Sequence, residues 1–164
     1  MSDPFTGGCQ CGAVRYRALT RPESPHLCFC RMCQKAAGNY FVALGSVANE
    51  DFQLTRGTPA WFASSDLVQR GFCAQCGTPL FYQGIGGGHI SILLGSLDDP
   101  ETVAPEWQSD VDGKTSWFSA LDTLPESIGD ETAEQQAERY QAIKNTSHQH
   151  PDHDTENWPL RTQK

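Results

Sequence analysis

Cys28-Phe29-Cys30-Arg31-Met32-Cys33 brings three cysteines, the central triplet, into one short segment of a 164-residue chain. A segment this short can direct three thiolates at one point, and thiolate sulphur is a natural ligand of a soft divalent metal such as zinc. Three protein ligands leave a tetrahedral ion one ligand short, a feature that separates catalytic zinc sites from structural ones. The stretch therefore predicts a metal site whose fourth position is open to another group.

The other cysteines form an N-terminal pair, Cys9 and Cys11, and a late pair, Cys73 and Cys76. Residues i and i+2 of an extended strand point to the same face, so the N-terminal pair can reach one ion. The late pair and Gly77 make a Cys-x-x-Cys-Gly run, which is typical of a zinc knuckle because the glycine lets backbone N–H groups approach the sulphurs. All seven cysteines therefore have metal-binding spacings, and we predict two bound zinc ions.

Two partitions of the cysteines are compatible with these spacings. In the first, the N-terminal and late pairs form a closed four-thiolate site and the central triplet forms an open one. A metal that closes so long a loop restricts the unfolded chain, so the closed site would stabilise the fold. In the second, Cys30 and Cys33 join the late pair as a zinc ribbon, which leaves three cysteines unassigned. We prefer the first partition for that reason.

The fourth position of the triplet site has several candidate occupants. His26 is close in sequence, and His89 could reach the site if the glycine loop before it folds over. Either histidine would make the site structural. Arg31 and Lys35 flank the triplet, and they are either ordinary surface charges or groups that balance thiolate charge or hold an anionic substrate.

Composition restricts the class of protein. The net charge of −8 disfavours nucleic acid and anionic membranes as partners, because both reward a basic face. The longest apolar runs, such as 90–94, are too short to span a bilayer. Residues 1–4 lack the charged and apolar regions of a signal peptide, and an odd number of cysteines argues against a disulfide framework. We expect a cytoplasmic protein.

Short segments separated by turn signals predict a mainly β fold. One short helix is expected at 31–37, ended by Gly38. The prolines of 21–25 predict a break in regular structure, and the glycines of 84–88 predict a hairpin loop or a mobile lid. The expected strands are 13–19, 39–47, 51–54, 78–83 and 89–95.

The last part of the chain is more polar. Trp117, Leu121 and Leu124 predict an amphipathic turn that packs on the sheets. Residues 130–144 contain good helix formers with one apolar stripe, and Asp130 is the expected N-cap.

The remainder, 145–164, is a polar tail in which the histidines are expected to be solvated: His148, His150 and His153. We therefore divide the chain into a zinc-binding domain, 1–128, and a C-terminal helix with a polar tail, 129–164.

Several runs together resemble the glutathione-dependent formaldehyde-activating enzyme family (S-(hydroxymethyl)glutathione synthase-like), which includes centromere protein V-like members. The resemblance covers about residues 5 to 125. The matching runs are Gly8-Cys9-x-Cys11-Gly12-x-Val14-Arg15-Tyr16, Cys28-x-Cys30-x-x-Cys33, Phe72-Cys73-x-x-Cys76-Gly77-Thr78-Pro79-Leu80 and Leu94-Gly95-Ser96-Leu97-Asp98-Asp99-Pro100.

This resemblance implies an Mss4-like fold, built from several short coiled β-sheets around a structural zinc. By the same analogy, the structural zinc is held by Cys9, Cys11, Cys73 and Cys76, and a second, catalytic zinc is held by Cys28, Cys30 and Cys33. The implied activity is that of a zinc-dependent carbon–sulfur lyase, which condenses or cleaves the adduct of a glutathione-type thiol with formaldehyde or another small aldehyde. The alternative is a non-catalytic, zinc-stabilised binding module.

Overall fold

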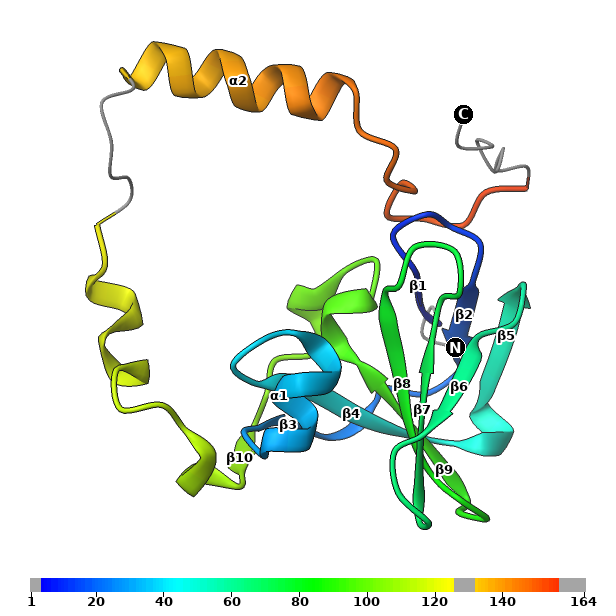
Figure 1. Cartoon of the computed structure of the whole chain (residues 1–164). Coiled ribbons are helices and arrows are strands. Elements are labelled where there is room, and N and C mark those ends of the chain that lie inside the picture. Colours follow the sequence, from blue (N-terminus) through cyan, green and yellow to red (C-terminus); the bar gives the residue numbers. More distant parts are fainter. Residues whose placement is uncertain (1–3, 126–131, 157–164) are drawn as a thin grey trace.

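The computed structural model describes residues 4–125 and 132–156. Within these residues, two β-sheets form the body of the molecule (Figure 1). The strands are β1 (Phe5–Gly8), β2 (Arg15–Ala18), β3 (Glu23–Cys28), β4 (Val42–Ala48), β5 (Phe52–Arg56), β6 (Ala60–Ala63), β7 (Val68–Phe72), β8 (Pro79–Gly84), β9 (His89–Leu93) and β10 (Trp107–Ser109). The helices are α1 (Arg31–Ala37) and α2 (Ala133–Asn145), with short 3-10 turns at η1 (Asn49–Asp51), η2 (Leu94–Ser96), η3 (Pro100–Thr102), η4 (Val111–Gly113) and η5 (Phe118–Thr123). The predicted mainly β fold with a C-terminal helix is confirmed.

The smaller sheet has the strand order β1-β2-β5, and the larger has the order β10-β3-β4-β9-β8-β7-β6. Strand β10 pairs in parallel with β3 and places Ser109 opposite Cys28, so the end of β3 that carries the triplet is flanked by a distant segment. The glycines of 84–88 form the turn between β8 and β9, where Gly87 and Gly88 accept hydrogen bonds from Asn49. The hairpin-loop prediction is therefore confirmed.

One core lies between the sheets. The ring of Tyr16 on β2 packs at 5.3 Å from that of Phe81 on β8, and the Phe52 ring of β5 lies 5.2 Å from Phe81. Cys9 and Cys73 belong to the same buried cluster. The sulphurs of the N-terminal and late pairs therefore lie against the core that joins the two sheets.

Two strands beside the triplet were not expected. Strand β3 occupies Glu23–Cys28, although the prolines predicted a break there. The strand accommodates a proline because its pairing with β4 is irregular between Glu23 and His26. Ser24 has a positive φ of 50°, which marks the same distortion. Strand β10 is three residues long and has no alternating pattern, so its pairing with β3 left no signal in the sequence.

The deepest packing contacts of the turn η5 come from Phe118, which was not among the residues predicted to pack. Phe118 makes edge-to-face contacts with Phe29 at 4.9 Å and with Phe41 at 5.9 Å between ring centroids. The residues expected to pack on the sheets, Trp117, Leu121 and Leu124, are exposed. The Trp117 ring contacts the Tyr40 ring edge-to-face at 4.6 Å, between the end of α1 and the start of β4.

Helix α2 is capped by Thr132, whose side chain and that of Gln135 form a reciprocal capping box. Asp130, the expected N-cap, lies outside the described residues. The predicted apolar stripe is exposed, with Tyr140 and Ile143 both more than half accessible. The stripe therefore contributes no buried side chain to the core.

The segment after α2, residues 147–156, returns to the β1–β2 turn, and we call it the C-terminal strap (Figure 1). His150 is only 4% exposed, and its backbone N–H donates to the Gln10 carbonyl at 2.7 Å. The prediction that His150 is solvated is wrong, because its neighbours come from segments far away in sequence. His148 and His153 are exposed, as predicted.

No helix among residues 4–125 and 132–156 combines the length and the apolar character that a membrane crossing requires.

Candidate metal centres

The N-terminal and late pairs meet in one four-cysteine cluster. All four Sγ atoms lie within 4.8 Å of one another, with 3.6 Å between Cys9 and Cys11 and 3.7 Å between Cys11 and Cys73. Zinc–sulphur bonds of about 2.3 Å in a tetrahedron place the sulphurs about 3.8 Å apart, so this spacing fits a bound zinc. None of the seven cysteines forms a disulfide in the structure.

Local backbone geometry explains how the four sulphurs converge. Gly12 and Gly77 both have positive φ, 73° and 77°, which turns the chain back after each pair. The Val14 N–H donates to Cys9 Sγ at 3.2 Å, and the Gln75 N–H donates to Cys73 Sγ at 3.4 Å. These bonds stabilise thiolates, which are the form that binds metal.

The central triplet forms a second cluster, with all three sulphurs within 4.8 Å of one another. Cys28 ends β3, and Cys30 is the N-cap of α1, where its sulphur accepts a hydrogen bond from the Cys33 N–H at 3.3 Å. Gly38 ends the helix with a φ of 61°, as the sequence predicted. Strand end and helix start therefore direct the three sulphurs at one point, and the alternative zinc-ribbon grouping is not what the structure shows.

Two charged groups touch the triplet from opposite segments. Arg70 of β7 is 9% exposed, and its Nη2 donates to Cys33 Sγ at 3.4 Å. Asp110 is exposed, and its Oδ2 lies 3.5 Å from Cys28 Sγ. A cation therefore approaches the buried side of the cluster, and a carboxylate approaches its solvent side.

The pKa values of Cys30 and Cys33 are shifted in opposite directions. Burial raises the pKa of Cys33 to about 12, although the Arg70 guanidinium acts to lower it. Burial also acts to raise the pKa of Cys30, but the Cys33 N–H and the neighbouring thiols outweigh it and bring the pKa below its usual value. Cys30 is half-buried and Cys33 is buried, so the thiol with the lower pKa is also the more accessible of the two.

Neither candidate histidine belongs to the triplet cluster. The His26 ring stacks on Trp107 at 4.3 Å, and its Nδ1 lies 2.9 Å from the Ser24 carbonyl oxygen. His89 begins β9, whereas Leu93 at the other end of that strand packs against the cluster. Among the described residues, the group that could hold a metal ion at this site is therefore Cys28, Cys30 and Cys33. Arg31 and Lys35 are both exposed on α1.

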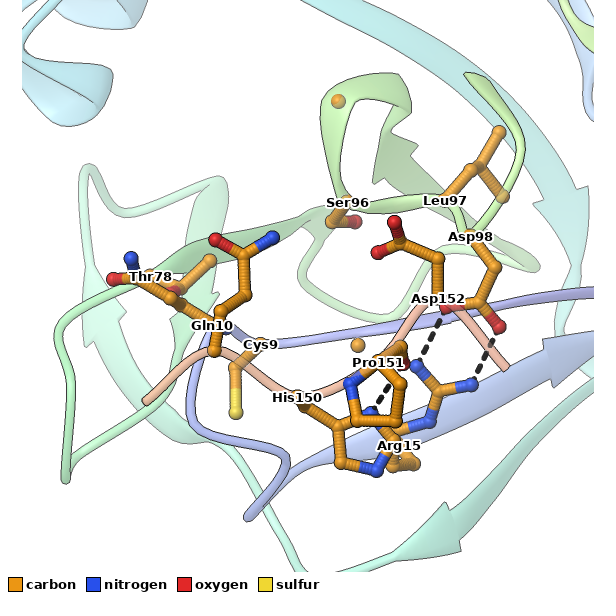
Figure 2. Close-up of a pocket in the computed structure, with 13 residues that line it drawn as sticks. Cys9, Gln10, Arg15, Thr78, Ser96, Leu97, Asp98, His150, Pro151 and Asp152 are labelled. Atoms are coloured by element: carbon orange, nitrogen blue, oxygen red, sulfur yellow. Dashed lines mark hydrogen bonds and ion pairs between the residues drawn. The ribbon is translucent and has the colours of Figure 1, made fainter. Parts of the chain in front are cut away.

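Two pockets lie near the clusters. A polar pocket of about 220 Å³ adjoins the four-cysteine cluster under the C-terminal strap, and Figure 2 shows Arg15 and Asp98 facing one another there. Arg15 and Asp98 pair with each other, so neither charge is free for a ligand. A more apolar pocket of about 310 Å³ is lined by Ala37, Val42 and Leu93, which also pack against the triplet.

Three residues of the triplet site were missed from the sequence: Gln34, Arg70 and Asp110. Arg70 and Asp110 are distant in sequence from the triplet, and no local pattern links them to it. Gln34 follows Cys33 directly, but a glutamine in a short helix gives no sign that it will be buried.

Comparison with known proteins relates the chain to one family. The sequence model of the glutathione-dependent formaldehyde-activating enzyme family matches residues 4–111. A Halomonas elongata protein described as "putative glutathione-dependent formaldehyde-activating enzyme" is 31% identical over 46% of this chain and 53% of its own length. A Podospora anserina protein with the same description is 33% identical over 49% of this chain and 41% of its own length.

A third relative, described as an uncharacterized lyase of Schizosaccharomyces pombe, is 26% identical over 48% of this chain and 56% of its own length. The chain thus matches about half the length of these relatives. A crystal structure of a Rhodobacter sphaeroides protein aligns with 63% of this chain and 99% of its own, with 18% identity and a TM-score of 0.49.

Proposed function

This chain belongs to the glutathione-dependent formaldehyde-activating enzyme family, and from that premise we propose that it is a zinc-dependent carbon–sulfur lyase. Its proposed substrates are a glutathione-type thiol and formaldehyde or another small aldehyde, or the adduct that they form. The observation that carries the proposal is the triplet cluster, because three sulphurs would fill three of the four positions of a tetrahedral zinc and leave the fourth for a substrate sulphur.

The proposed reaction joins the thiol sulphur to the carbonyl carbon. A carbon–sulfur bond forms, the carbonyl π electrons move to oxygen, and the thiol proton ends on that oxygen, which gives an S-hydroxyalkyl adduct. Lysis is the reverse. A zinc ion held by three thiolates would lower the pKa of a bound thiol, and its reduced positive charge favours this role over polarising the carbonyl.

The residues around the triplet would divide the remaining work. Arg70 would hold the Cys33 thiolate from the buried side and offset its negative charge. Ala37, Val42 and Leu93 would shield the reacting atoms from water on one side. Asp110 would face the substrate from the solvent side, next to Cys28.

The remaining assignments belong to the same proposal. The four-cysteine cluster would hold a structural zinc, within a zinc-binding domain of residues 1–128 followed by a helix and tail of 129–164. The acidic charge supports small molecules rather than nucleic acid as partners, and we propose a cytoplasmic location.

Adduct exchange measured by NMR tests the proposed activity. Purified protein is mixed with glutathione and formaldehyde, and the exchange rate between free and adduct signals is compared with a buffer blank. The expected result is faster exchange with wild-type protein, and no acceleration with the Cys30→Ser variant. Rates equal to the blank across a range of thiols and aldehydes would exclude the lyase and favour the non-catalytic binding module.

A further inference from the structure

The side chain of Gln34 bonds to three of the segments around the triplet. It is 8% exposed, on the inner face of α1. Its Nε2 lies 3.0 Å from the Phe29 carbonyl oxygen, 3.2 Å from that of Tyr40 and 2.9 Å from that of Gly113. Because carbonyl oxygens only accept hydrogen bonds, the amide nitrogen must point toward them.

These carbonyls belong to segments that carry or border the site. Phe29 lies between two of the cysteines, Tyr40 follows the end of α1, and Gly113 ends the turn that begins next to Asp110. The Phe29 N–H also donates to the Ser109 carbonyl at 3.1 Å. Gln34 and this backbone bond therefore hold two segments against each other: residues 28–33, which we call the triplet loop, and residues 110–113, which we call the Asp110 turn.

The Asp110 turn is held in a constrained geometry. Asp110 has φ 52° and ψ 44°, a left-handed conformation that non-glycine residues seldom adopt. A Cβ atom at Gly113 would overlap the Phe29 carbonyl, so the turn packs directly on the triplet backbone. Such a conformation persists only when its surroundings fix it, and here Gln34 supplies a bond at the far end of the turn.

We propose that Gln34 is a positioning residue of the triplet site, because its amide sets the triplet loop and the Asp110 turn in one fixed relation. This inference rests on the proposed function for its catalytic consequence, and on the structure alone for its effect on metal binding. Groups that orient metal ligands without touching the metal commonly change metal affinity by about 10- to 100-fold when they are removed.

The test replaces Gln34 by methionine, which keeps the volume of the side chain and removes both N–H donors. Gln53→Met is the matched control, since it deletes a side-chain bond to Arg17 on the exposed face of β5. Each protein is loaded with Co²⁺, and the ion is withdrawn with a competing chelator while the thiolate absorption of each site is followed. We expect the triplet site of Gln34→Met to lose about 10-fold or more in affinity, with the four-cysteine site unchanged and Gln53→Met like wild type.

Selective loss at one site separates positioning from general support of the fold. Equal weakening of both sites, wild-type affinity at both, or failure of Gln34→Met to fold would each overturn the proposal. If wild-type protein shows no lyase activity but Gln34→Met still loses metal selectively, the proposed function fails and the positioning role stands. If activity is present, we expect kcat to fall with little change in KM.

Discussion

Arg15 and Asp98, which are 83 positions apart, form a two-pronged ion pair with distances of 2.7 Å and 2.5 Å. Arg15 is 3% exposed and extends from β2, and Asp98 follows η2. The hydroxyl of Tyr16, the next residue on β2, lies 2.7 Å from Oγ of Ser96, which is two positions before Asp98. The polar contacts fix the smaller sheet to the segment that leaves the larger one, beside the four-cysteine cluster.

Replacing Asp98 by asparagine should destabilise the fold by about 3 kcal/mol, because it leaves a buried guanidinium with one carboxylate fewer. Asp154 of the strap still pairs with Arg15, which keeps the loss at the lower end of the usual range. Chemical denaturation of the metal-loaded protein measures the change. Asp99→Asn is the control, since Asp99 is exposed and asparagine can keep its cap on η3; equal losses in the two variants would contradict the prediction.

The same pair predicts acid sensitivity. Burial acts to raise the pKa of Asp98, but the hydrogen bonds and charge of Arg15 outweigh it and the pKa lies below its usual value. As the pH falls, the Asp98 carboxylate therefore takes up a proton at a higher pH in the unfolded chain than in the folded protein. The contribution of Asp98 to the free energy of unfolding is full above about pH 4 and is lost as the pH falls through the folded pKa. Stability measured from pH 6 down to about pH 2 should fall less steeply in Asp98→Asn than in wild type.

Substituting single cysteines should separate the two clusters. Cys30→Ser should fold and lose one metal ion, because serine keeps the N-cap of α1 while removing a thiolate. Cys76→Ser should lose most folded structure, because the four-cysteine cluster joins the N-terminal strand region to the segment before β8. Metal analysis and circular dichroism measure both effects. An unfolded Cys30→Ser, or a fully folded Cys76→Ser, would contradict the assignment.

Short-range patterns account for what the sequence could predict. The spacings of the N-terminal pair, the late pair and the central triplet identified the cysteines of the two clusters, and Gly38 identified the end of α1, since each depends on neighbours in the chain. The pairing of β10 with β3 and the burial of His150 depend on contacts between distant segments. Such contacts leave no periodic signal, so no pattern in the sequence could have supplied them.

Backbone strain at Asp110 predicts that replacement by glycine and replacement by alanine will change the stability of the protein differently. Asp110→Gly should be neutral or stabilising within about 1 kcal/mol, because glycine adopts positive φ without steric cost. Asp110→Ala keeps the strain and removes the side-chain oxygen, so it should be less stable than Asp110→Gly by about 1 kcal/mol. Thermal unfolding compares the two variants directly. Equal stability would mean that the turn relaxes in solution.

The contacts of His150 predict that the C-terminal strap docks more firmly while this imidazole is neutral. Its Nδ1 lies 2.7 Å from the Pro151 carbonyl oxygen, so Nδ1 must carry the hydrogen. Its Nε2 lies 3.2 Å from Nη1 of Arg56, which can only donate, so Nε2 must accept. Protonation would replace this bond with two facing cations.

The charges around His150 lead to the same expectation. Burial is the largest cause that lowers its pKa, the Pro151 carbonyl acts to raise it, Arg15 and Arg56 lower it, and Asp98 raises it. The net pKa lies below the usual value for histidine, so the released strap binds the proton more readily than the docked one. Docking is therefore at full strength above about pH 6.5 and weakens as the pH falls through the docked pKa.

NMR titration of the histidine ring protons measures this difference. The titration of His150 in the folded protein is compared with that of the same ring in the denatured chain. We expect His150 to titrate at lower pH in the folded protein, and amide exchange of the strap to speed up through the same transition. In His150→Gln, exchange should become fast and lose its pH-dependent step in that range. Coincident titration of His150 in the folded and denatured states would show that the strap does not exclude the proton, and docking would then have to rest on Asp154 and Thr155, which contact Arg15 and Arg56.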